Sequence, residues 1–320
     1  MKEKVVIRNC SLFVIITLSF ALVIFSNTGY AQDEVIRVDT NLITIPTAVL
    51  SRDGRYVANL KKEDFQIFED GVEQEIDYFE STEQPFTILL LLDVSGSMKA
   101  FLGNLALAAN VFVRKLRPDD KLIVVTFSDQ INTLLEPTKI KDFEGRIKLK
   151  QKLLEGDTIL YDAVERALKK MRKIQGRKAI VLFSDGVGTG LATAKGTIRT
   201  AEEQEALIYT IKFGTDPVER PSYANRKSYF KRVEEIEGYM RDLAVKTGGR
   251  NYQIEVISDL ESTFGTIADE LGRQYSLGYY PKTEGKKGER RQIKVKVRQP
   301  NLAVRARESY VFEESKNKQR

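Results

Sequence analysis

The chain has 320 residues, of which 42% are hydrophobic and 30% charged, with a formal net charge of +6. These values are ordinary for a globular protein, and the scattered positive charges do not indicate a nucleic-acid surface. The sequence contains no histidine, and its single cysteine is Cys10. Ser-His-Asp triads, Cys-His pairs and histidine zinc sites are therefore excluded, which leaves carboxylates, hydroxyls, amides, lysine and arginine for function.

Residues 1–31 have the pattern of a secretory signal peptide. Lysines and an arginine precede the uncharged stretch SLFVIITLSFALVIF, and Gly29 and Ala31 form a small-x-small site. We expect cleavage after Ala31, with an uncleaved anchor as the alternative. In either case the folded part is exported to the periplasm, the cell surface or the medium. After cleavage the chain has neither a cysteine nor a predicted membrane span.

Residues 35–82 alternate in the manner of β-strands. NLITIPTAVL places Ile43, Ile45, Thr47 and Val49 on one face, and Asp53-Gly54 predicts a turn. A second hairpin is expected in DFQIFEDGVEQEIDYF, with its turn at Asp70-Gly71. This segment is too short to close a core alone.

From residue 85 to 275 apolar strands alternate with amphipathic helices, which is typical of a doubly wound, mostly parallel α/β sheet covered on both faces. Strands are expected at TILLLLDV, KLIVVTF, KAIVLFSD, ALIYTIKFG and RNYQI, with INTLL as a shorter apolar segment. Helices are expected over 101–116, 141–154, 159–174, 192–205, 231–246 and 259–275.

Residues 276–313 return to a strand pattern, in YSLGYYP, RQIKVKVRQ and AVRARESYVF. Because neither terminal segment makes a good domain alone, we expect residues 35–82 and 276–313 to form one small β-sandwich. The α/β domain of residues 85–275 would then be inserted between its halves. Residues 314–320 are predicted to be a solvated tail.

Oxygen-bearing side chains occur where three segments of the α/β region meet. Asp93, Ser95 and Ser97 follow the first strand in DVSGS, Thr158 precedes a helix in GDT, and Asp185 ends a strand in FSDG. Functional groups of doubly wound sheets gather at the carboxyl ends of the strands. Two carboxylates and three hydroxyls are hard ligands that suit a small divalent cation, most naturally Mg²⁺, with Mn²⁺ and Ca²⁺ as alternatives.

These three elements resemble the metal-ion-dependent adhesion site of the von Willebrand factor type A domain family, and the resemblance covers about residues 85–275. It implies that Ser95, Ser97 and Thr158 bind the metal directly and that Asp93 and Asp185 act largely through water. The flanking β segments also resemble the secreted bacterial proteins described as acidobacterial VWFA-related. One departure is Asp157, which either adds negative charge near the metal or caps the following helix.

Each residue of this set also has an ordinary structural interpretation. Asp93, Ser95, Ser97 and Thr158 are residue types that cap helices, and Asp185-Gly186 is a common turn. Only their occurrence together, in order and at element boundaries, favours a metal site. The glycines near Gly186 do not match the dinucleotide-binding fingerprint.

We therefore expect a secreted, non-enzymatic binding module. Its metal would be completed by a carboxylate from another protein or from a surface polymer. An envelope-scaffolding protein with an incidental metal site is the alternative. A metal-dependent hydrolase is less favoured, because no histidine or cysteine can act as base or nucleophile near the site.

Overall fold

The computed structural model describes residues 42–80, 84–150, 158–186, 191–204, 206–214, 226–283 and 285–312, with the backbone alone for residues 226–229. All of them belong to one compact unit. The predicted signal peptide, the predicted tail and Asp157 lie outside the described residues.

A six-stranded sheet forms the centre of the α/β part, in the order β10-β9-β8-β5-β6-β7. Five strands run parallel, and only the edge strand β7 is antiparallel to its neighbour β6. The strands are β5 (Thr87–Asp93), β6 (Lys121–Phe127), β7 (Ile131–Lys139), β8 (Lys178–Ser184), β9 (Leu207–Phe213) and β10 (Asn251–Ile254). This is the doubly wound sheet that the sequence predicts.

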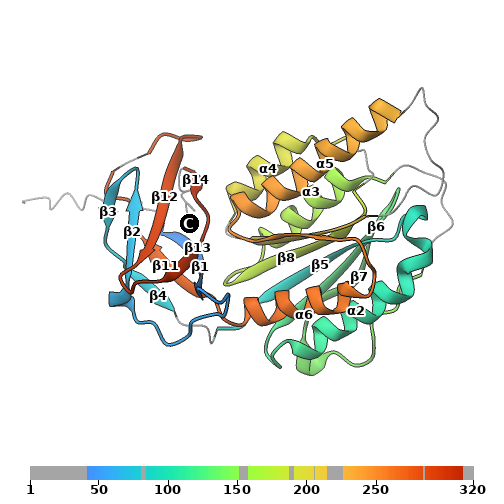
Figure 1. The fold of residues 1–320 in the computed structure, drawn as a ribbon, viewed down its shortest axis with the longest axis horizontal. Coiled ribbons are helices and arrows are strands. Elements are labelled where there is room, and N and C mark those ends of the chain that lie inside the picture. Colours follow the sequence, from blue (N-terminus) through green and yellow to red (C-terminus); the bar gives the residue numbers. More distant parts are fainter. Residues whose placement is uncertain are drawn as a thin grey trace, which may run out of the picture. The chain divides into compact units, whose positions relative to one another are not determined.

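Helices cover both faces of this sheet (Figure 1). α2 (Leu102–Lys115) and α6 (Asp259–Leu271) pack on one face; α3 (Leu160–Met171), α4 (Ala194–Glu202) and α5 (Arg226–Lys246) pack on the other. The strands read as apolar runs because both of their faces are buried. Along β5, for example, Leu90 and Leu92 belong to the α2–α6 core, and Leu89 and Leu91 belong to the core under α3 and α5.

Two four-stranded sheets, β13-β1-β11-β4 and β14-β12-β2-β3, form the flanking β part. Their shared core contains residues from both sheets, including Ile45, Ile67, Leu277 and Ile293. The strands are β1 (Ile43–Ser51), β2 (Phe65–Glu69), β3 (Val72–Gln74), β4 (Tyr78–Glu80), β11 (Tyr275–Tyr279), β12 (Arg290–Val297), β13 (Leu302–Arg305) and β14 (Ser309–Val311). The predicted β-sandwich built from both ends of the chain is confirmed, whereas its predicted residue boundaries stay a prediction.

The helix expected over residues 141–154 is wrong where the structure describes it. Only a short 3-10 helix, η4 (Ile140–Asp142), forms there, and Gly145 has a φ of 110°. The Asn110 side chain takes up the backbone of Ile147, accepting from its N–H at 2.9 Å and donating to its carbonyl at 3.0 Å. These bonds occupy the backbone groups of Ile147 that a helix would use, and residues 143–150 form no helix.

The single strand expected in AVRARESYVF is also wrong. The structure divides it into β13, which pairs with β1, and β14, which pairs with β12. Arg307, between the two strands, donates to the Thr44 carbonyl at 2.7 Å. The segment therefore changes from one sheet of the sandwich to the other, which an alternating sequence pattern does not reveal.

Within the described residues, one helical stretch is long and apolar enough to cross a membrane, Gly96–Lys115. It comprises the 3-10 helix η3 (Gly96–Phe101) and α2. Its Leu105, Ala108 and Phe112 are fully buried in the core against the sheet. Core helices of this kind pass the same test of length and composition.

Candidate functional site: the carboxyl edge of the central sheet

The loop after β5 gathers the first three predicted residues. The Ser95 amide donates to Asp93 Oδ1 at 2.9 Å, and the hydroxyls of Ser95 and Ser97 lie 3.1 Å apart. Ser95 precedes η3 without a side-chain capping bond. The two hydroxyls therefore converge on one point beside the Asp93 carboxylate, and helix capping does not explain the Ser95 side chain.

The end of β8 brings Asp185 to the same place. Strand β8 lies directly beside β5. The Ser184 hydroxyl donates to Asp93 Oδ2 at 2.6 Å and accepts from the Gly186 amide at 3.0 Å. Ser184 thus ties the Asp93 carboxylate to the turn that carries Asp185. Gly186 has a φ of 84°, a conformation that favours glycine.

Thr158 lies at the same edge of the sheet. The Ile159 amide donates to the Ser128 carbonyl at 2.8 Å, and Ser128 directly follows Phe127, the strand partner of Asp93. The N-cap of α3 is Ile159, so Thr158 is not the cap of this helix. The chain thus brings its third predicted segment to the carboxyl ends of β5 and β6, beside the loop of Asp93.

The electrostatics of this edge favour a cation. Asp93 is fully buried, and Asp185 is only 5% exposed. Burial, and then the nearby Asp185 carboxylate, raise the pKa of Asp93 to about 7. A buried pair of carboxylates resists losing both protons unless a positive charge compensates them. A divalent cation held by these carboxylates and the neighbouring hydroxyls supplies that charge, so the residues present fit such an ion.

The site has a buried side and an open side. The carboxylates and Ser95 are buried, whereas Ser97 is exposed and Thr158 is partly exposed. Among the described residues, no group of three or more His, Cys, Asp or Glu side chains could hold a metal. With only two carboxylates, a metal here would depend on hydroxyl and water ligands and would retain room for an outside oxygen.

Three polar residues of this edge were not predicted from the sequence: Ser184, Lys212 and Glu237. Ser184 has a weak signal, since it is a hydroxyl at the end of an apolar strand. Lys212 is the single charge in the strand LIYTIKF of β9 and could have been noticed. Glu237 gives no signal, because its orientation depends on how α5 packs.

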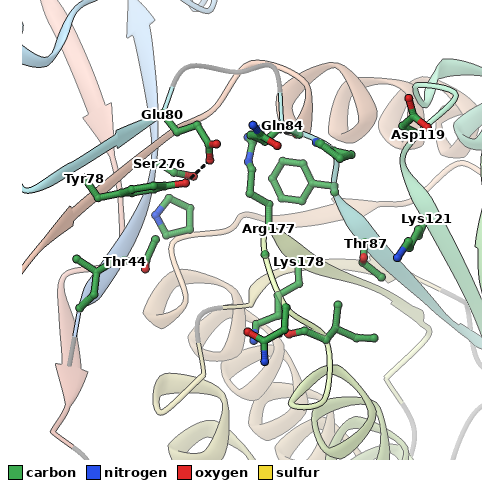
Figure 2. A pocket seen from close by; sticks show the side chains of 17 residues that line it. Thr44, Tyr78, Glu80, Gln84, Thr87, Asp119, Lys121, Arg177, Lys178 and Ser276 are labelled. Carbon is green, nitrogen blue, oxygen red and sulfur yellow. Dashed lines mark hydrogen bonds between the residues drawn. The ribbon is translucent and has the colours of Figure 1, made fainter. Parts of the chain in front are cut away.

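A pocket of about 460 Å³ lies away from this site, lined at the amino ends of β5, β6 and β8 and by β1 and β4 (Figure 2). Arg177, one of its lining residues, stacks on the Phe86 ring at 4.0 Å. Arg177 also donates to the carbonyls of Gln84 and Gln274, both at 2.9 Å. These bonds hold together the two chain crossings between the α/β part and the sandwich, which is a structural role.

Comparison with known families agrees with the geometry of the carboxyl edge. The family model described as von Willebrand factor type A domain matches residues 88–187. Over these residues the chain is therefore similar to the von Willebrand factor type A domain family. The matched stretch runs from β5 past Asp185, so it includes the Asp93 loop, Thr158 and the end of β8. The resemblance to this family is thereby confirmed.

The similarity extends to proteins named UPF0353. A UPF0353 protein of Mycobacterium avium is 25% identical over 212 residues, which are 60% of this chain and 62% of the relative. A UPF0353 protein of Mycobacterium marinum is 24% identical over the same shares. The chain therefore spans less than two thirds of the length of these relatives.

Among solved structures, a von Willebrand factor type A protein of Catenulispora acidiphila is 11% identical, with a TM-score of 0.44. That alignment covers 87% of this chain and 76% of the other. An ArnB paralog of Sulfolobus acidocaldarius is 17% identical, with a TM-score of 0.45 over 83% of this chain and 76% of the other.

Proposed function

We propose that this protein is an exported binding module that holds an acidic group of a partner through Mg²⁺ at the carboxyl edge of its type A domain. The observation that carries the proposal is that Asp93, Ser95 and Ser97 lie together after β5 and that Ser184 ties Asp93 to the turn carrying Asp185. The backbone bond of Ile159 to Ser128 places Thr158 at the same edge of the sheet. Export rests on the signal-peptide pattern of residues 1–31.

The donor set suggests how the residues divide the work. Both oxygens of Asp93 already accept hydrogen bonds, from the Ser95 amide and the Ser184 hydroxyl. Asp93 is therefore suited to hold a metal-bound water, while Ser95, Ser97 and Thr158 offer hydroxyl oxygens directly. A metal with few anionic ligands remains electron-poor, so a carboxylate of a partner protein or surface polymer is a favourable sixth ligand. Mn²⁺ and Ca²⁺ are alternative occupants.

Binding, rather than catalysis, is the role that these groups support. The sequence has no histidine, and its single cysteine precedes the apolar stretch of the predicted signal peptide. Nucleophilic catalysis of the Ser-His or Cys-His kind is therefore out of reach.

The decisive experiment is calorimetric titration of the full chain with MgCl₂. We expect wild-type protein to bind Mg²⁺ and Asp93→Ala to lose binding while circular dichroism shows an intact fold. Asp269→Ala serves as the matched control, because Asp269 lies in α6 in an exposed pair with Lys115. Equal Mg²⁺ affinity of wild type and Asp93→Ala would refute the proposed site.

The partner requires a second experiment. Immobilised protein is incubated with envelope extract in Mg²⁺ or in EDTA, and bound material is compared between wild type and Asp93→Ala. Retention that needs both Mg²⁺ and Asp93 supports adhesion through the metal. An oligomer that survives EDTA, with no metal-dependent retention, would favour an envelope scaffold instead.

A further inference from the structure

A row of polar side chains crosses three neighbouring strands at the edge that carries the candidate metal site. The row consists of Asp93 on β5, Ser184 on β8 and Lys212 on β9. Ser184 and Lys212 are paired in the parallel ladder, and the Ser184 hydroxyl reaches Asp93 at 2.6 Å. Alternate residues of a strand share a face, so all three lie on the face covered by α3, α4 and α5.

The last member of this row, Lys212, is directed to α5. Its ammonium bonds Glu237 Oε1 at 2.5 Å, and the two side chains are 12% and 33% exposed. The Lys212 chain passes close to the turn of the metal site, because its Cε lies 3.5 Å from the place where a Cβ on Gly186 would stand. The mostly buried Lys212 ammonium is therefore paired with Glu237 of α5, while its side chain lies against Gly186, the residue that follows Asp185.

We infer that Glu237 keeps the Lys212 ammonium out of the metal site and that this pair sets the affinity of the site for its divalent cation. The inference rests on the proposed function. Lysine has a flexible four-carbon stem, so an ammonium that lost Glu237 would be free to turn to the carboxylates of this edge, those of Asp93 and Asp185. There it would occupy the place of the metal charge and oppose a divalent ion.

The expected size of the effect follows from Coulomb's law. A unit charge added close to a divalent ion, in a partly buried region, changes its binding constant by about tenfold or more. Glu237→Gln therefore weakens Mg²⁺ binding by about tenfold. Lys212→Gln leaves the Glu237 charge beside the site and tightens binding. The double variant carries neither charge and returns close to wild type.

The test is calorimetric titration of full-chain wild type and these three variants with MgCl₂. Glu235→Gln is the matched control, because Glu235 lies on the same helix in an exposed pair with Lys231 and should change the affinity less than twofold. Opposite shifts in the two single variants, cancelling in the double variant, support the inference. A purely structural ion pair would instead weaken binding, or leave it unchanged, in both single variants.

A crystal structure of Glu237→Gln gives an independent readout. We expect the Lys212 ammonium within ~4 Å of the Asp93 or Asp185 carboxylate. Wild-type binding of Mg²⁺ with unchanged affinity in all variants would overturn this inference and leave the proposed function standing. Failure of the wild-type chain itself to bind a divalent cation would overturn both.

Discussion

Asp93 combines complete burial with a second carboxylate nearby, which makes the stability of the metal-free protein depend on pH. Its carboxyl group has an ordinary pKa of 3.8, which burial and Asp185 raise to about 7 in the folded protein. Between these values the folded state holds a proton that the unfolded chain has released. Raising the pH through this window therefore lowers the free energy of unfolding, by on the order of a few kcal/mol in total.

Asp93→Asn should remove this dependence. In EDTA, the free energy of unfolding of Asp93→Asn relative to that of wild type should increase when the pH is raised from 5 to 8. The reason is that wild type must ionise the buried Asp93 in this range, whereas the variant has no carboxylate at this position. Urea unfolding of both proteins at the two pH values measures their difference in free energy of unfolding. Contributions of other titrating groups are common to both proteins and cancel in this difference. A difference that stays constant between pH 5 and pH 8 would show that Asp93 ionises without penalty.

Ser184 is predicted to position Asp93 for metal binding. Ser184→Ala removes the hydrogen bond to Asp93 Oδ2 and the tie to Gly186, so Mg²⁺ affinity should fall about 10-fold or more, the range for partners of metal-site groups. Ser262→Ala, an exposed serine of α6 bonded to the Asp259 carbonyl, should leave affinity unchanged. Unaltered affinity of Ser184→Ala in the titration would contradict this role.

At the scale of single residues, the sequence indicated the candidate oxygen donors but not the polar side chains around them. Asp93 and Asp185 stand out because charged residues end apolar strands, and sheet topology alone brings such ends together. Ser184 ends β8 with a hydroxyl, which is only a weak signal, whereas Lys212 is the single charge of β9 and could have been noticed. Glu237 depends on the rotation of α5 about its axis, which no local pattern fixes.

Among the elements, the turn after β8 has the tightest packing demand at the site. A Cβ on Gly186 would stand 3.0 Å from Ile236 Cγ2 of α5, and the backbone φ of 84° disfavours other residues. We expect Gly186→Ala to lower the free energy of unfolding by about 2 to 4 kcal/mol, because strain and overpacking add. Chemical unfolding measures the loss.

Gly54 provides the control for this prediction. It has a similar φ of 77°, but no atom lies within 4 Å of its Cβ position. Gly54→Ala should therefore cost only the backbone strain, about 1 kcal/mol. Equal losses in the two alanine variants would mean that α5 yields freely at Ile236.

Elements with strong periodicity were predicted well, and elements defined by tertiary contacts were not. The apolar strands of the central sheet and α3 occur where the pattern places them. The segment 141–154 has helical composition, yet Asn110 of α2 bonds both backbone groups of Ile147, and no helix forms over the described residues 143–150. The division of AVRARESYVF between two sheets likewise depends on its partners β1 and β12 rather than on its own residues.

At the scale of the whole molecule, buried charges join the sandwich to the α/β part. Glu270 of α6 is fully buried and accepts hydrogen bonds from Arg305 of β13 and from Tyr56 and Tyr209. Glu202 of α4, which is 2% exposed, forms a bidentate ion pair with Arg290 of β12. Nη1 and Nη2 of Arg290 donate to Oε1 and Oε2 of Glu202 at 2.5 and 2.6 Å. Each pair connects an α/β helix to a sandwich strand.

Arg305→Ala should strongly destabilise the protein. It leaves the buried Glu270 carboxylate without its cation, a change that typically lowers the free energy of unfolding by about 3 to 5 kcal/mol. The control is the exposed ion pair of Lys115 with Asp269, the residue that precedes Glu270. Lys115→Ala should lower the free energy of unfolding by less than about 1 kcal/mol. Urea unfolding compares the two. Similar small losses would show that solvent reaches Glu270.

The pairing of β1 also fixes an order of events during synthesis. β1 lies between β11 and β13, and both follow it only after the complete α/β region. When synthesis has reached α6, neither of the strands that pair with β1 in its sheet has yet been made, so β1 has no sheet partner. A chain terminated before β13 would leave at least one edge of β1 unpaired. Unpaired strand edges favour aggregation with other incomplete chains.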